Sequence, residues 1–300
     1  MTAGRLQGRV AVVTGGGRGL GRSYALALAR HGASVVVNDL GGDLHGSGQD
    51  PTAAQSVVAE ITAAGGRAAT SGHDVSDWAQ AKALVDAAVN TFGGIDVLVN
   101  NAGILRDRLF ANMSEGDWDA VIRVHLKGHA APARHAMEYW RTESKAGRMV
   151  KASIIHTTSV AGLVGSFGQA NYAAAKLAVV GLSRTLALEG VKYGVRSNAV
   201  SPSARTRIET SLQPPPAGVF DTFAPDNVAP LICWLALADC PATGQVFQAY
   251  GNRIGVIAPS AIAVDLEADG QWALDDVEKA LAGRLPQLPK IGDFVEGLPL

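Results

Sequence analysis

The sequence has no excess of either charge and very little cysteine. Its 26 basic and 27 acidic side chains give a formal net charge of −1, too little to attract nucleic acid or anionic lipid over a distance. Its two cysteines, Cys233 and Cys240, match neither a zinc pattern nor a redox pair, so we expect buried thiols in a reducing compartment. The seven histidines are dispersed. We therefore expect no nucleic-acid partner and no metal site.

Long apolar runs are also missing. The longest, residues 230–238, is about half of the roughly 20 residues that cross a bilayer, so it predicts a core helix and no membrane partner. The first residues pass from a short polar lead directly into an apolar strand, without the apolar stretch and cleavage site of an export signal. We therefore expect a cytoplasmic protein.

What the chain does contain is an alternation of short β-branched runs with alanine-rich segments of helical length. This pattern predicts a doubly wound α/β fold of Rossmann type, with a parallel sheet of about seven strands covered by helices on both faces. The runs are VAVVTG, SVVVND, AATSGHDV, IDVLVNN, SIIHTTS and VRSNAVS, with a seventh strand near residues 245–249. Helices are predicted over residues 20–31, 52–64, 77–92, 115–141, 170–190 and 226–239.

The last fifty residues lack this alternation, although residues 275–283 are typical of a helix. We predict one domain over residues 1–250 and an extension over residues 251–300, which is too short for a core of its own. The extension is expected to cover the substrate pocket or a subunit interface. Residues 41–50 and 211–220, rich in glycine or proline, are candidate mobile loops.

A glycine-rich turn, TGGGRGLG, follows the first predicted strand and leads into a helix. Glycines let the backbone approach a pyrophosphate, and the helix N-terminus offers it unpaired N–H groups. A plain tight turn is the alternative, whereas a P-loop is disfavoured because no Lys-Ser or Lys-Thr closes the loop. The predicted cofactor-binding residues of this turn are Gly15, Gly17, Arg18, Gly19, Leu20 and Gly21.

Asp39 ends the second predicted strand, where an acid can hydrogen-bond both ribose hydroxyls of an adenosine. A carboxylate there would repel a 2′-phosphate, so it favours NAD over NADP as the cofactor. Arg18 is an argument for NADP, because it could reach such a phosphate. Asp39 could also be only a turn residue before Gly41.

Further polar residues follow the carboxyl ends of other strands, the edge at which open α/β sheets bind ligands. Tyr172 and Lys176 are four apart, which places them on one side of a helix. The residues that follow the third, fourth and fifth predicted strands are Asp74 and Val75, then Asn101, Ala102 and Gly103, and then Ser159.

Four motifs in this order and spacing resemble the short-chain dehydrogenase/reductase superfamily over about residues 6–250: TGGGRGLG, NNAG, Ser159 and YAAAK. Five longer segments resemble the (3R)-hydroxyacyl-CoA dehydrogenase part of the peroxisomal multifunctional β-oxidation enzymes and their bacterial stand-alone relatives. They are VVNDLGGD (36–43), NNAGILRDR (100–108), RVHLKG (123–128), FGQANYAAAK (167–176) and APLICWLALADC (229–240).

The resemblance implies roles for the polar residues. Tyr172 would be the general base in oxidation and the general acid in reduction. Because a free tyrosine, with a pKa of about 10, is a poor base at neutral pH, Lys176 and the oxidised nicotinamide are expected to lower its pKa. Lys176 would also hold the nicotinamide ribose, while Ser159 would hydrogen-bond the substrate oxygen. Thr206 would bind the nicotinamide carboxamide.

The chain departs from the family at two positions. His125 stands where the family usually has asparagine, and it is a candidate for a catalytic proton relay through its backbone carbonyl. The alternative is a hydrogen-bonded helix histidine without a role. Ser203 replaces a common glycine, which puts the local loop shape in doubt. Arg106 and Arg108 could bind an anionic substrate group such as a CoA phosphate, or could be surface charge.

The sequence thus predicts an NAD-dependent oxidoreductase that interconverts a secondary alcohol and a ketone, with a (3R)-3-hydroxyacyl-CoA as the favoured small-molecule substrate. A hydroxysteroid dehydrogenase, a 3-oxoacyl carrier-protein reductase and a non-catalytic dinucleotide-sensing protein are the alternatives. In the family the helices that match residues 115–141 and 170–190 pair between subunits, which implies a homodimer or homotetramer.

Overall fold

The computed structural model describes residues 4–206, 213–216, 218–260, 262, 264–268, 270–282 and 284. The chain divides into two compact units, Met1–Val256 and Ile257–Leu300, and every predicted site residue belongs to the first. The predicted loop over residues 211–220 lies partly outside the described residues. Residue 283, the last of the helix predicted over residues 275–283, lies outside them as well. The helix predicted over residues 275–283 is α9, Leu274–Ala282, in the second unit.

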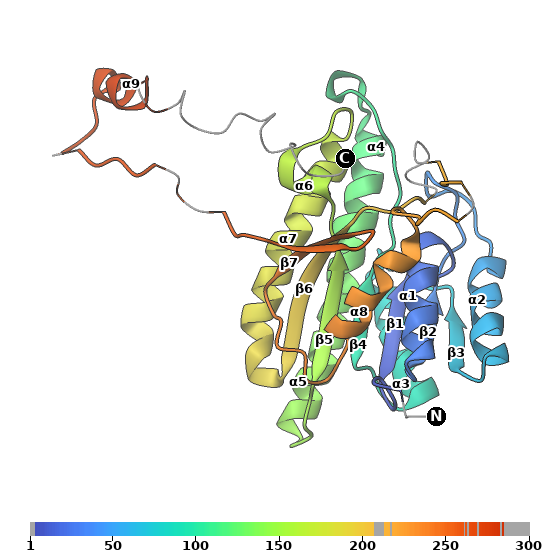
Figure 1. The fold of residues 1–300 in the computed structure, drawn as a ribbon. Helices are drawn as coiled ribbons and strands as arrows, with labels where there is room; N and C mark the ends of the chain where they lie inside the picture. The colour runs from blue at the N-terminus through green and yellow to red at the C-terminus, as the bar shows by residue number, and fades with distance from the viewer. Residues whose placement is uncertain are drawn as a thin grey trace. The chain divides into compact units, whose positions relative to one another are not determined.

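One sheet with the strand order β3-β2-β1-β4-β5-β6-β7-β8 forms the centre of the first unit (Figure 1). Its strands β1 to β7 pair in parallel, which confirms the predicted doubly wound α/β fold. The chain order reverses between β1 and β4, and open sheets bind ligands at such a switch point. The strands are β1 (Val10–Thr14), β2 (Ser34–Asn38), β3 (Arg67–Ser71), β4 (Val97–Asn100), β5 (Ala152–Thr157), β6 (Val195–Pro202), β7 (Val246–Tyr250) and β8 (Arg253–Ile257).

The sheet has one strand more than the seven that the sequence pattern indicates, because that pattern does not reveal β8. Only Gly251 and Asn252 separate β8 from β7, and a connection of two residues joins antiparallel neighbours. Gly251 has φ of +52°, a conformation that glycine adopts readily. The side chains of Ile254 and Val256 are 60% and 62% exposed, so β8 lacks the buried apolar run by which the inner strands are recognised.

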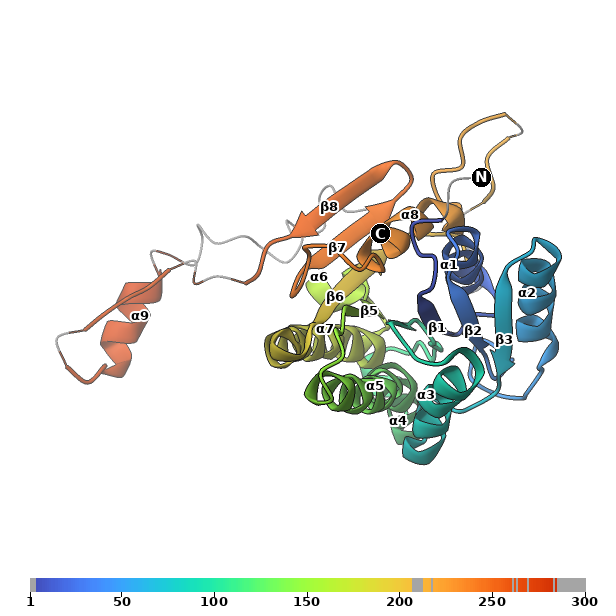
Figure 2. The same ribbon diagram turned by 90° about the horizontal axis from the view of Figure 1, so that it is seen from below.

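Side chains that alternate along the strands supply two cores, one on each face of the sheet. Ala11 and Val13 of β1 belong to the cluster that includes α1, α2 and α8, whereas Val10 and Val12 belong to the cluster with α3 and α5. Figure 2 shows α1 and α8 on one side of the sheet and α3, α5 and α7 on the other. The helices of this unit are α1 (Gly19–Arg30), α2 (Thr52–Ala63), α3 (Trp78–Phe92), α4 (Glu115–Ile122), α5 (Gly128–Lys145), α6 (Val160–Val164), α7 (Ala170–Gly190) and α8 (Ala229–Leu235). Short 3₁₀ turns cover Phe110–Asn112, Val191–Tyr193 and Pro225–Asn227.

The single helix predicted over residues 115–141 is wrong in two respects. A π-helical turn, Arg123–Lys127, separates α4 from α5, and π turns are common at functional sites. Helix α5 also continues to Lys145, four residues beyond the predicted end at residue 141. Gly147, with φ of +81°, then turns the chain away from the helix.

The helix predicted over residues 226–239 ends early, at Leu235. The guanidinium of Arg196, on β6, donates hydrogen bonds to the carbonyls of Leu235, Leu237 and Cys240 at 3.4, 2.6 and 2.9 Å. These bonds satisfy carbonyls that a continuing helix would pair internally. Cys240 and Cys233 are buried free thiols, as predicted. Among the helices that the structure describes, none has the length and apolar character needed to span a membrane.

Leu98, on the central strand β4, tests the packing of the α3 and α5 face. Its side chain is fully buried in the cluster that contains Val12, Leu84 and Ile154. We expect Leu98→Ala to lower the free energy of unfolding by about 2–5 kcal/mol, because it removes buried methyl groups and leaves a cavity. Urea denaturation at fixed protein concentration measures this change. Met149→Ala is the control, since Met149 is 84% exposed, and an equal loss in both variants would contradict the assignment.

Candidate active site

A cavity lies at the carboxyl edge of the sheet, beside the switch point between β1 and β4. Its wall includes most of the residues predicted to bind a cofactor, namely Gly15, Arg18, Gly19, Leu20, Asp39, Asp74, Val75, Asn101, Ala102, Gly103 and Thr206. Gly17, Gly21, Tyr172 and Lys176 are not part of this wall. The structure thus gathers segments that follow five different strands, β1, β2, β3, β4 and β6, around one cavity.

The glycine turn is built so tightly that side chains could not replace its glycines. Gly15 has φ of +62°, and a Cβ on it would lie 2.9 Å from the Cα of Ala102. A Cβ on Gly21 would lie 2.0 Å from the carbonyl oxygen of Gly15. Helix α1 starts here, at Gly19, and no side chain caps its N-terminus. Its first N–H groups are therefore available to an anion, which fits a pyrophosphate.

Asp39 lies half-buried in the cavity wall. Its carboxylate accepts hydrogen bonds from the backbone N–H groups of Gly17 at 2.8 Å and Gly41 at 2.7 Å. These two bonds fix the carboxylate, so Asp39 both shapes the turn and faces the cavity. Arg18 forms an ion pair with Asp50 at 3.3 Å and donates to the carbonyl of Gly42 at 3.2 Å. The guanidinium that could hold a 2′-phosphate is therefore engaged within the chain.

Asn101 and Thr14 join the ends of β4 and β1. The amide of Asn101 donates to the carbonyls of Thr14 and Gly15, at 3.0 and 3.2 Å, and its backbone N–H donates to the Thr14 hydroxyl at 2.9 Å. The same hydroxyl accepts from the N–H of Ala102 at 3.1 Å. Asn101 thus shapes the cavity by holding the glycine turn. Thr14 is a residue that the sequence analysis missed, although it opens the TGGGRGLG motif.

Asp74 follows β3 on the far side of the cavity. One of its carboxylate oxygens accepts hydrogen bonds from the N–H and the hydroxyl of Ser76, at 2.8 and 2.7 Å. Val75 beside it is buried. Thr206, which follows β6, lies opposite the glycine turn, because a Cβ on Gly19 would come within 3.4 Å of its methyl group.

Ser159, Tyr172 and Lys176 come together where β5 ends. Ser159 caps α6 through a hydrogen bond from the N–H of Ala161, while Tyr172 and Lys176 lie in the first turns of α7. The Lys176 side chain is 2% exposed, and its Nζ donates to the carbonyl of Thr157 at 2.7 Å. The same Nζ lies 5.6 Å from the centre of the Tyr172 ring.

The expectation that the surroundings lower the pKa of Tyr172 does not hold for the chain by itself. Burial raises the pKa of the Tyr172 phenol to about 12, although a hydrogen bond with Ser159 acts in the opposite direction. Burial also lowers the pKa of Lys176 to about 7. The low polarity around both groups disfavours the phenolate and the ammonium, and this effect outweighs the attraction between these two charges.

His125 lies in the π-helical turn with its ring edge-on to Tyr172, the ring centres being 5.0 Å apart. Its Nε2 lies 3.0 Å from the backbone N–H and 2.7 Å from the carbonyl of Ile104, so its tautomer decides which of them it bonds. Burial holds the pKa of His125 well below its ordinary value. A Cβ on Gly103 would lie 2.4 Å from this ring, so neutral His125 packs against the NNAG segment. A relay through its backbone carbonyl stays a prediction.

A second buried polar group, which the sequence analysis did not single out as functional, lies beneath β4 and β5. The rings of His129 and His156 are stacked with centres 5.5 Å apart, and the amide of Asn100 donates to the carbonyl of His129 at 3.1 Å. Burial lowers the pKa of both histidines, that of His156 to about 3, and the charge of Lys176 lowers both further. Both rings are therefore neutral bases at physiological pH.

Comparison with known proteins agrees with this geometry. The chain is 46% identical over 252 residues to the peroxisomal multifunctional enzyme type 2 of Mus musculus, covering 84% of this chain but only 33% of that one. It is 42% identical to the hydroxyacyl-CoA dehydrogenase ChsB1 of Mycobacterium tuberculosis, covering 94% and 91% of the two chains. A solved structure of a short chain dehydrogenase from Mycobacterium avium is 49% identical, with a TM-score of 0.87 over 96% of this chain and 98% of that one.

The chain thus spans about a third of the mouse protein and nearly all of the two mycobacterial ones. A family profile described as short chain dehydrogenase matches residues 9–215, the stretch that contains the glycine turn, Ser159, Tyr172 and Lys176. The chain therefore belongs to the short chain dehydrogenase family and is an oxidoreductase of CH–OH groups.

Proposed function

We propose that this protein is an NAD-dependent dehydrogenase that converts a (3R)-3-hydroxyacyl-CoA to the 3-oxoacyl-CoA and back. The observation that carries the proposal is the meeting of Ser159, Tyr172 and Lys176 at the sheet edge that holds the cavity. The printed names of the mouse and Mycobacterium tuberculosis relatives support the substrate class. Because the match covers only 33% of the mouse enzyme, only a dehydrogenase step is proposed for this chain.

In this mechanism Tyr172 receives the proton of the substrate hydroxyl during oxidation and returns it during reduction. The glycine turn and Asp39 would hold NAD, which would supply the acceptor for the hydride of the carbinol carbon. Ser159 donates a hydrogen bond to the substrate oxygen and keeps it within reach of the phenol. Lys176 is held by the Thr157 carbonyl beside the Tyr172 ring. When Lys176 is protonated, its positive charge stabilises the phenolate of Tyr172.

The preference for NAD rests on Asp39 and Arg18. A 2′-phosphate at this end of the cavity would meet the fixed carboxylate of Asp39, whose charge is poorly screened in a half-buried position. Arg18, the nearest source of compensating charge in the glycine turn, is paired with Asp50. This arrangement disfavours a 3-oxoacyl carrier-protein reductase that uses NADPH. A panel of acyl-CoA and steroid alcohols, monitored by NADH absorbance, separates the hydroxyacyl-CoA substrate from a steroid.

Tyr172 is the proposed proton acceptor. We expect Tyr172→Phe to lower kcat/KM by about 10²- to 10⁴-fold while NADH still binds, because the ring remains but the proton acceptor is lost. Steady-state kinetics and NADH fluorescence titration measure the two effects. Tyr193→Phe is a matched control, since Lys192 lies 5.0 Å from the Tyr193 ring centre in a similar pair outside the cavity wall. A Tyr172→Phe enzyme that keeps most of its rate would refute the assignment.

The pH dependence of oxidation provides a second test. Because the base must be ionised and burial raises the pKa of Tyr172, the rate of oxidation should increase with pH through the alkaline range. Ser159→Ala removes the hydrogen bond that lowers this pKa, so its profile of kcat/KM should move to higher pH. Profiles recorded between about pH 6 and 11 compare the two enzymes. An unchanged profile, or a shift to lower pH, would contradict the proposed contact.

The cofactor preference is tested at Asp39. Asp39→Asn removes the charge but keeps an acceptor for one of the two glycine N–H groups. We expect the ratio of the Kd for NADP to the Kd for NAD to fall about tenfold, equivalent to ~1.4 kcal/mol. Asp86→Asn is the control, because Asp86 pairs with Lys82 on the exposed side of α3. Wild-type protein that binds NADP as tightly as NAD would overturn the preference.

A further inference from the structure

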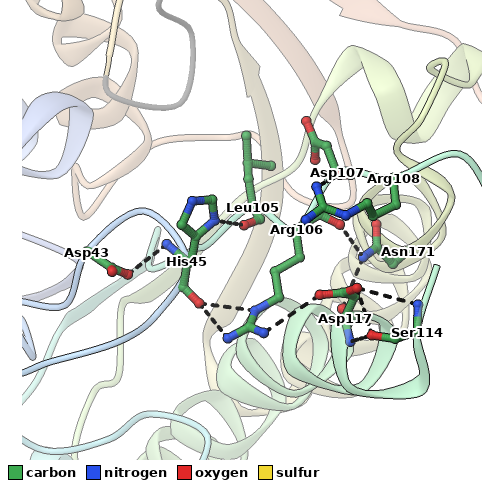
Figure 3. Close-up of polar contacts among 9 residues, drawn as sticks. All are labelled: Asp43, His45, Leu105, Arg106, Asp107, Arg108, Ser114, Asp117 and Asn171. Carbon is green, nitrogen blue, oxygen red and sulfur yellow. Dashed lines mark hydrogen bonds and ion pairs between the residues drawn. The ribbon is translucent and has the colours of Figure 1, made fainter. Parts of the chain in front are cut away.

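The loop after β2 forms part of the cofactor cavity and is bonded to the segment after β4. Gly42, Asp43, Leu44, Gly46 and Gly48 of this loop belong to the cavity wall. The N–H of Leu105 donates to the carbonyl of Leu44 at 3.0 Å, and Nδ1 of His45 lies 3.0 Å from the carbonyl of Leu105 (Figure 3). The cofactor loop, residues 41–50, is thus attached to the chain that leads from NNAG.

Arg106 adds the strongest of these attachments. Its Nε and Nη2 both donate to the carbonyl of His45, at 3.2 and 3.0 Å, and its Nη1 lies 3.7 Å from Oδ1 of Asp117. Asp117 belongs to the first turn of α4, where its other oxygen and the Ser114 side chain form a capping box. Figure 3 shows the Arg106 side chain extended between the loop and this helix. Arg106 therefore fixes the cofactor loop to the start of α4.

Asn171 continues the connection toward the catalytic tyrosine. Its side chain is fully buried, and its Nδ2 donates to the backbone carbonyls of Arg106 and Asp117, at 3.2 and 3.1 Å. Its Oδ1 accepts the backbone N–H of Tyr172 at 2.8 Å. Gln169, at the N-cap position of α7, makes no side-chain cap, but its Nε2 donates to Oδ2 of Asp107 at 2.9 Å, so Gln169 and Asn171 both attach the start of α7 to this segment.

We propose that Arg106 and Asn171 are positioning residues that couple docking of the cofactor loop to placement of Tyr172. The inference rests on the proposed function. The path is continuous: the His45 carbonyl binds the Arg106 side chain, the Arg106 carbonyl binds the Asn171 amide, and Asn171 binds the Tyr172 N–H. The Arg106 guanidinium makes no contact with the phenol, so its effect on the reaction passes through Asn171. These contacts give Arg106 a role beyond surface charge, and a contact with a CoA phosphate stays a prediction.

Because the path consists of consecutive hydrogen bonds, we expect a disturbance at either end to reach the other. A change at Arg106 should disturb the first turn of α7, which carries Tyr172, and a change at Asn171 should weaken the binding of NADH beside the cofactor loop. A residue that only stabilises the fold would change the melting temperature without this paired effect.

The experiment uses Arg106→Met and Asn171→Ser. We expect Arg106→Met to lower kcat about fivefold or more at saturating NAD with a (3R)-3-hydroxyacyl-CoA. We expect Asn171→Ser to raise the Kd for NADH, measured by fluorescence titration without substrate, by a similar factor. Arg148→Met is the matched control, since Arg148 is exposed, pairs with Glu143 and is not part of the cavity wall.

Three results would overturn the inference. One is an Arg106→Met enzyme that binds NADH more weakly but keeps the wild-type kcat at saturating NAD. Arg106 would then act only on the cofactor loop. Another is a folded Asn171→Ser protein with unchanged affinity for NADH. If Asn171→Ser does not fold, the kcat of Arg106→Met decides by itself. Wild-type protein that binds no NADH would instead refute the proposed function, and the coupling with it.

Discussion

The site depends on one buried amine. Lys176 is almost inaccessible to water, and its Nζ is held by the carbonyl of Thr157 at the end of β5. A bond in the opposite direction, from the Thr158 hydroxyl to the carbonyl of Lys176, fixes the same helix turn to the sheet at 2.7 Å. Gly162 of α6 packs against this turn so closely that a Cβ would lie 2.8 Å from the backbone of Lys176. Ser159 and Tyr172 are therefore held at fixed places relative to β5.

The cost of burying this amine explains the electrostatics of its neighbours. Water is excluded around Lys176 and the histidines beneath β4 and β5, and Tyr172 is partly buried beside them, so each group favours its uncharged form. The stacked rings of His129 and His156 are neutral bases that add no positive charge next to the amine. A turn that carries few competing charges, as the first turns of α7 do, responds strongly to any single charge placed beside it.

Much of the fold and of the cavity follows from patterns within the sequence. The strands β1, β2, β4 and β5 are buried throughout and mostly apolar, and polar residues at their carboxyl ends must share one edge of a parallel sheet, so the cavity wall was predictable. The features that the sequence patterns did not predict depend on burial and on contacts between residues that are distant in sequence. The end of α8 is set by Arg196, about forty positions earlier, and the exposed strand β8 has no buried face to reveal it. The direction of the Tyr172 pKa depends on burial, which spacing does not encode.

The uncapped start of α1 has a thermodynamic consequence. The helix begins at Gly19 with no side chain to satisfy its first N–H groups, in a turn where three glycines leave no room for one. A dinucleotide phosphate would complete this helix end as a cap does, so ligand binding and the integrity of the first βαβ unit are linked by mass action. Without a ligand, the protein should therefore open locally first at the glycine turn. A bound dinucleotide should protect the amide hydrogens of this turn from exchange.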